Sequence, residues 1–286
     1  MQKRDNTSAK KSKEVKSKAL NTTLFLNVEA SVQNISSSKA ICSFCGAESL
    51  AASSSWICEH CECINSEASK LFSDDPKFKL VLSALSSSDV DKLSQTLQDY
   101  ERLANVSQDN RFFYALGFLY MRLSDLYLSN LRYDRKDFMY ENTLLRYNAT
   151  SAESRAKLFL FKAAKHGDSV ESIFTSFIAY IKLGRLKDAK RVLELLSSIR
   201  IPRVQSLIKY ASIIFYIESK DYDSVIKSAG ELINERCCTA NVAYYLAYAL
   251  YKTRKYEKAL RILKILSSIM SNSKATALKD SIEARK

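Results

Sequence analysis

The stretch Arg254-Lys255-Tyr256-Glu257-Lys258-Ala259 decides the fold, because two related stretches precede it at regular distances. These are Gly184-Arg185-Leu186-Lys187-Asp188-Ala189 and Lys220-Asp221-Tyr222-Asp223-Ser224-Val225, so the successive spacings are 36 and 34 residues. Each stretch begins with polar residues, and apolar residues recur at helical spacing before and after it. The sequence therefore predicts pairs of helices joined by similar turns and repeated along the chain.

The composition favours a mainly α protein. The 286 residues include only 5 Gly and 2 Pro, which is little turn punctuation for a strand-rich fold. Helical spacing begins near residue 76, so we expect a helical domain over residues 76–286. Asp89, and either Asp109 or Asn110, follow short polar segments and are predicted to cap the helices after them.

The period resembles that of the tetratricopeptide repeat (TPR), a helix pair of about 34 residues that stacks into an α-solenoid. The clearest repeats are expected at 170–205, 206–239 and 240–272. Upstream, Phe113 to Tyr120 resembles the first helix of the family, with Phe in place of Trp. Residues 130–169 do not match and are expected to hold an irregular insertion or extra helices. An ordinary helical bundle is the alternative to a solenoid. The last repeat matches best, with Leu246, Ala247, Leu250, Tyr256, Ala259 and Leu263 at the packing sites of the family.

The resemblance implies a concave groove lined by the first helix of each repeat. The groove-facing sites carry aromatic or apolar residues, with basic residues near three of the four helix ends. Such a surface suits a peptide or helix with apolar anchors and acidic flanks. The alternative is that the aromatic side chains pack between neighbouring helices. The candidate groove residues are Tyr114, Phe118, Phe174, Ile178, Lys182, Tyr210, Ile214, Tyr244, Tyr248 and Lys252.

Four cysteines near the N-terminus have the spacing C-x2-C-x12-C-x2-C. Cys42, Cys45, Cys58 and Cys61 match the pattern of a zinc ribbon, in which two β knuckles surround one zinc ion per chain. Gly46 directly follows the first pair and suits the positive φ of such a knuckle. We expect the ribbon over residues 39–66, with a core separate from that of the helices.

Other uses of these cysteines are less consistent with the sequence. A disulfide pair requires an oxidising compartment, and a thioredoxin-like pair accompanies a βαβ pattern that this chain lacks. His60 and Cys63 are alternative ligands, but the four-cysteine set is complete without them. Because four thiolates leave no open position for water, the zinc ion is predicted to be structural rather than hydrolytic.

The net charge of +13 comes from two regions. Residues 1–41 carry 8 basic and 3 acidic side chains, and residues 150–286 carry 25 and 13. Residues 1–38 are predicted to be a basic disordered tail, which is the composition of a solvated arm or a nuclear-localisation patch. The basic C-terminal half predicts weak, nonspecific binding to polyanions.

No catalytic constellation is evident in a chain with 2 His and 5 Gly. Apolar segments are interrupted by Lys or Glu too often for a membrane span. We therefore expect an intracellular protein, cytoplasmic or nuclear, that acts as a non-enzymatic adaptor through its groove and its ribbon. The alternative is a nucleic-acid-associated factor that uses the basic C-terminal half and the ribbon to engage RNA, DNA or the transcription machinery.

Overall fold

The computed structural model describes residues 39–45, 48–50, 56–65, 89–107, 109–131, 139–165, 167–235, 239–269 and 273–284. The expected basic tail lies outside these residues. The chain divides into two compact units, of which one comprises residues 37–204 and the other includes residues 205–286. Ten helices and two short strand pairs are present in the described residues, so the mainly α prediction is confirmed.

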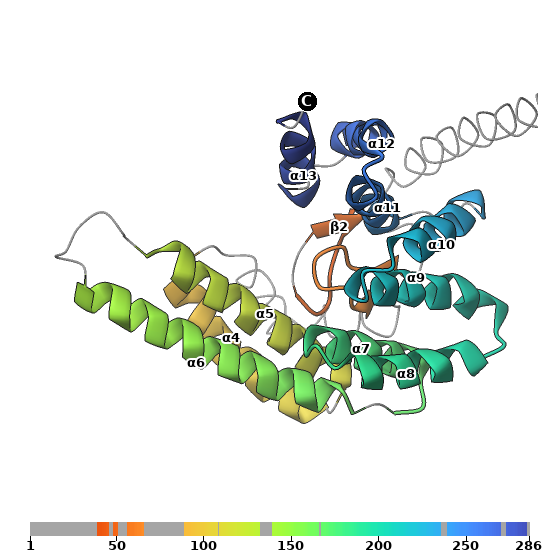
Figure 1. Cartoon of the computed structure of the whole chain (residues 1–286). Helices are drawn as coiled ribbons and strands as arrows, with labels where there is room; N and C mark the ends of the chain where they lie inside the picture. The colour runs from red at the N-terminus through yellow and green to blue at the C-terminus, as the bar shows by residue number, and fades with distance from the viewer. Residues whose placement is uncertain are drawn as a thin grey trace, which may run out of the picture. The chain divides into compact units, whose positions relative to one another are not determined.

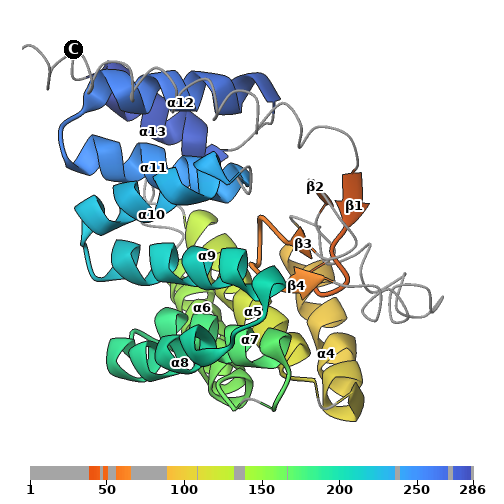
Figure 2. The same cartoon turned by 90° about the vertical axis from the view of Figure 1, so that its right-hand side faces the viewer.

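The unit of residues 37–204 begins with two antiparallel strand pairs. β1 (Lys39–Ile41) pairs with β2 (Glu48–Leu50), and β3 (Trp56–Ile57) pairs with β4 (Ile64–Asn65). Figure 2 shows both strand pairs in shades of orange. The helices that follow are α4 (Val90–Ser107), α5 (Asn110–Ser129), α6 (Met139–Ala163), α7 (Val170–Lys182) and α8 (Leu186–Ser198).

The second unit contains most of α9 (Pro202–Glu218) and the four helices after it. Tyr210 of α9 contacts Tyr245, and Lys209 of α9 forms an ion pair with Glu235. The last three helices pack in sequence order, as the blue segments of Figure 1 show. The elements after α9 are α10 (Tyr222–Asn234), α11 (Ala240–Lys252), α12 (Tyr256–Ile269) and α13 (Ser273–Glu283).

The predicted N-caps of α4 and α5 are confirmed. The side chain of Asp89 accepts hydrogen bonds from the backbone N–H groups of Asp91 and Lys92, at 2.9 and 3.1 Å. Asp109 accepts one from the N–H of Arg111 at 2.9 Å. Both carboxylates satisfy N–H groups that have no partner within their own helix.

The three turns that suggested the repeat have the same backbone structure. Gly184, Lys220 and Arg254 occupy equivalent positions and have φ values of 70°, 61° and 61°. At each turn the next residue donates its N–H to a carbonyl five residues earlier, which is the closure of a Schellman motif. The repetition of the turn is thus confirmed in both units. The three bonds run from Arg185 to Tyr180, from Asp221 to Tyr216 and from Lys255 to Leu250, at 2.9, 2.9 and 2.8 Å.

Residues 139–163, within the segment that matched no repeat, form the single long helix α6. Its alanine-rich face packs against α5, and the two helices lie side by side in Figure 1. The two helices lie close together at Gly117, where an added Cβ would lie 2.7 Å from Cγ of Leu160. Gly117 is therefore required for packing, because any side chain there would collide with α6.

Candidate metal centre

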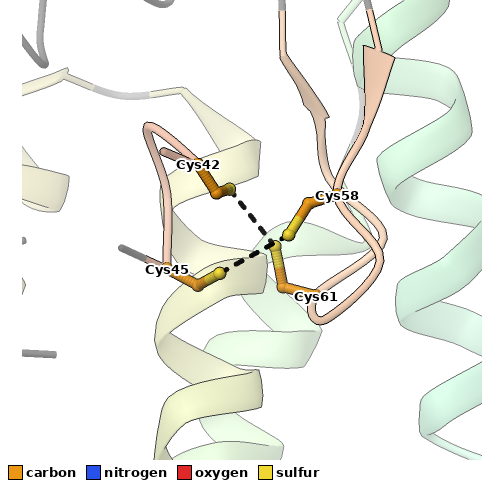
Figure 3. A group of neighbouring side chains, drawn as sticks. All are labelled: Cys42, Cys45, Cys58 and Cys61. Atoms are coloured by element: carbon orange, nitrogen blue, oxygen red, sulfur yellow. Dashed lines mark hydrogen bonds between the residues drawn. The ribbon is translucent and has the colours of Figure 1, made fainter. Parts of the chain in front are cut away.

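The four predicted ligands lie together in the structure. The sulfur atoms of Cys42, Cys45, Cys58 and Cys61 are buried and lie within 4.8 Å of one another. Figure 3 shows that the four side chains converge from the two knuckles. The Cys42–Cys61 and Cys45–Cys58 sulfur distances are both 3.7 Å, far longer than a disulfide bond. Four tetrahedral thiolates about 2.3 Å from one metal ion are separated by about 3.8 Å, so the cluster fits such an ion.

The two knuckles hold their first cysteine in the same way. The N–H of Phe44 lies 3.4 Å from the sulfur of Cys42, and the N–H of His60 lies 3.4 Å from the sulfur of Cys58. Both bonds stabilise negative charge on sulfur, as a metal-bound thiolate requires. Glu62, directly after the second pair, has a φ of 62°. Gly46, the equivalent residue of the first knuckle, lies outside the described residues.

Asn65 joins the two knuckles from a buried position. Its side-chain oxygen accepts a hydrogen bond from the N–H of Ser43 at 2.8 Å. Its amide group donates to the sulfur of Cys42 at 3.4 Å and to the carbonyl of Cys63 at 3.2 Å. The cysteine spacing gave no indication of this role, because Asn65 contacts the first knuckle 22 residues away.

The electrostatics of the cluster favour a bound cation. Burial opposes ionisation of Cys42, yet hydrogen bonds from Cys45, Cys58 and Cys61 hold its pKa well below the ordinary value. The pKa of Cys45 is raised, chiefly by its hydrogen bond with Cys42. The pKa of Cys61 is also raised, chiefly by burial. The protein alone thus stabilises a thiolate at Cys42, and ionising Cys45 and Cys61 requires a compensating positive charge.

The alternative ligands are not members of this set. His60 is exposed. Cys63 is buried, and its sulfur lies 3.9 Å from the carbonyl oxygen of Arg111. Burial raises the pKa of Cys63 to about 11. Neither residue belongs to the group of converging sulfur atoms.

The ribbon shares a core with α4 and α5, which corrects the expectation of separate cores. Phe44, between the first two cysteines, is fully buried, with its ring 5.2 Å from that of Phe112 in α5. Tyr100 of α4 is 5.9 Å from the same Phe112 ring and donates its hydroxyl hydrogen to the carbonyl of Phe44. Apolar burial joins the knuckle to the helices because the ribbon is too small to bury Phe44 alone.

Two charged side chains fix the ribbon to the helices as well. The guanidinium carbon of Arg111 lies 5.1 Å from the ring centre of Phe44, and the carboxylate of Asp109 orients this side chain through a 2.7 Å ion pair. Lys182, a candidate groove residue, has its Nζ atom 3.6 Å from Oε2 of the buried Glu62. In the structure Lys182 thus forms an ion pair with Glu62 of the ribbon.

Half of the ten candidate groove residues are buried between helices. A fully buried side chain cannot contact a partner without rearrangement, so the packing alternative describes the five buried residues. Phe118, Tyr244 and Tyr248 are half-buried, and Lys252 is exposed. Those four remain candidates for a binding surface. The buried five are Tyr114, Phe174, Ile178, Tyr210 and Ile214.

Comparison with protein-family models, curated proteins and solved structures finds no match for this chain. Among the described helices, none is both long and apolar enough to cross a bilayer.

Proposed function

We propose that the cysteine cluster holds one structural zinc ion, which secures the ribbon to a helical interaction scaffold. Thiolate ligands select soft or borderline metals, and a tetrahedral set of four is typical of zinc or of iron–sulfur centres. The knuckle form, with two C-x2-C pairs 12 residues apart, favours zinc. Zinc would supply the positive charge that the clustered thiolates need.

A structural role is supported above all by the burial of all four sulfur ligands. Four cysteines complete the coordination of a tetrahedral ion, which leaves no position for water or a substrate. The same cluster is the one group of three or more potential metal ligands in the described parts of the chain. In this proposal the metal stabilises the fold, and the protein acts without catalysing a reaction.

Native mass spectrometry of the full chain tests the metal assignment. The expected result is one zinc ion per chain, and its loss in Cys42→Ser. Cys63→Ser is a matched control, because it removes a neighbouring buried thiol from outside the converging set. Absence of metal from the wild type, or equal zinc loss in the two variants, would contradict the assignment.

The scaffold role rests on the repeated helix pairs and on one tyrosine-rich surface. The repeated turns support the resemblance to TPR solenoids, which bind peptides or helices. In α11, the rings of Tyr244 and Tyr248 stack with centres 6.4 Å apart, and Tyr222 of α10 contacts Tyr248 at 6.2 Å. The Nζ atom of Lys252 lies 5.1 Å from the ring centre of Tyr248. Half-buried tyrosines beside a lysine suit a peptide with apolar anchors and acidic flanks.

A peptide-display selection on the full chain tests this surface. We expect enrichment of peptides that combine apolar and acidic residues, and loss of their binding in the Tyr248→Ala and Lys252→Glu variants. Lys258→Glu is the control, because it makes the same charge change elsewhere in the second unit. Binding that survives both surface variants would contradict the assignment. If a defined RNA or DNA sequence instead binds about a thousandfold tighter than random competitors, the nucleic-acid alternative replaces the scaffold role.

A further inference from the structure

Helix α6 has apolar residues on two faces. Its buried face carries small residues and packs on α5, as described above. The opposite face carries a second stripe at alternating spacings of four and three residues, the pattern of a coiled-coil seam. We name this set the outer stripe. It consists of Tyr140, Leu144, Tyr147, Ser151, Ser154, Leu158 and Phe161.

The outer stripe is exposed although most of its residues are large and apolar. Tyr140 is 81% exposed and Tyr147 is 71% exposed, while Leu144, Leu158 and Phe161 are each about half exposed. At about 1.5 Å per residue, these side chains extend over roughly 30 Å of helix. A surface helix normally presents polar residues on the face opposite its core, so a stripe with five large, exposed apolar or aromatic residues indicates an interface.

The order of residues in the stripe is nearly the same in both directions. About a midpoint near Ser151, Tyr140 corresponds to Phe161 and Leu144 corresponds to Leu158. The large Tyr147 corresponds to the small Ser154. An antiparallel second copy of α6 would therefore place aromatic beside aromatic, leucine beside leucine, and large beside small. This self-complementarity is what a two-fold symmetric interface requires.

The charges beside the stripe select the antiparallel direction. Glu141 and Lys162 flank its two ends on the same side of the helix. In an antiparallel pair, each Glu141 lies near Lys162 of the other copy, which makes two attractive contacts. In a parallel pair, Lys157 on the other flank would instead lie near Lys162 of the other copy. We propose that the outer stripe of α6 binds a second copy of this chain, with the two α6 helices antiparallel and the two-fold axis near Ser151.

Sedimentation equilibrium of the full chain over a range of concentrations tests the proposal. We expect a reversible dimer, and at least about a hundredfold weaker self-association in Tyr147→Glu, because the variant buries two carboxylates at the seam. Leu195→Glu is the control, since Leu195 is an exposed leucine of α8 outside the stripe. A monomer at every concentration, or a dimer unaffected by Tyr147→Glu, would overturn the proposal.

A charge exchange tests the direction of the helices. Glu141→Lys and Lys162→Glu should each weaken the dimer about fivefold or more, because each change turns two attractive contacts into repulsive ones. The double variant should recover most of the wild-type affinity. Circular dichroism of each variant shows whether α6 remains folded, as Lys162 also lies 5.2 Å from the rings of Phe113 and Phe159. If both single variants are folded and their losses of dimer affinity add in the double variant, the antiparallel arrangement is refuted.

Discussion

Phe44→Ala should destabilise the helices of the first unit although Phe44 belongs to the ribbon. The side chain is fully buried, contacts Phe112 edge to face, and lies beneath the guanidinium group of Arg111. Truncation of a buried phenylalanine costs about 3–5 kcal/mol of the free energy of unfolding. For a unit of this size, each kcal/mol lowers the melting temperature by about 2–4 °C, so we expect a decrease of roughly 10 °C.

Two measurements locate the effect of Phe44→Ala. Thermal denaturation followed by circular dichroism at 222 nm gives the change in stability, and hydrogen exchange of α4 and α5 peptides gives its position. Ile41→Ala is the control, because Ile41 lies in the same ribbon but is 63% exposed. With Phe112→Ala in a double-mutant cycle, we expect a coupling energy of about 0.5–1.5 kcal/mol. Unchanged protection of α4 and α5 in Phe44→Ala would refute the shared core.

Four further variants test other parts of the structure. Cys42→Ser should lose zinc and also lower the stability of α4 and α5, because the ribbon shares their core; native mass spectrometry with circular dichroism checks both effects. Asn65→Ala should weaken zinc affinity by about 10–100-fold, as measured by competition with a chelator, because it removes the link between the knuckles. Gly117→Val should destabilise the protein by about 1–3 kcal/mol in chemical denaturation, since its side chain would collide with Leu160. Burial raises the pKa of Glu59 to about 7, so the folded state holds this proton more tightly than the unfolded state. The contribution of the bound proton to the free energy of unfolding is lost as the pH rises from about 4.5 to 7. Chemical denaturation should therefore show Glu59→Gln to be more stable than the wild type at pH 8 but not at pH 5. Equal stability of the two proteins at both pH values would contradict the effect of burial at Glu59.

The sequence predicted those features that depend on local spacing. Four cysteines at fixed intervals identify a ligand set, because a knuckle closes within a few residues. The repeated turns were predictable too, although Lys220 and Arg254 adopt the positive φ that the equivalent Gly184 has. The polar segments before their helices identified Asp89 as a cap and Asp109 as one of two candidate caps.

Features that depend on contacts between distant residues could not be predicted in this way. Phe44 and Tyr100 are 56 residues apart, and nothing local to either indicates that the ribbon packs on α4. Helical spacing identified Tyr114 and Phe174 as members of one apolar face, but it does not distinguish an exposed groove from a contact with another helix. In α6, apolar residues on two faces obscure a single helical period, which is why residues 130–169 matched no repeat.

Hydrogen exchange before and after removal of the metal tests the central claim most directly. We expect chelation to release one zinc ion per chain and to reduce the protection of α4 and α5, because Phe44, Tyr100 and Phe112 form a core with the metal-bound knuckle. The backbone of α11 and α12, in the other unit, should keep its protection and serves as the internal reference. Unchanged protection of α4 and α5 after loss of the metal would contradict the claim.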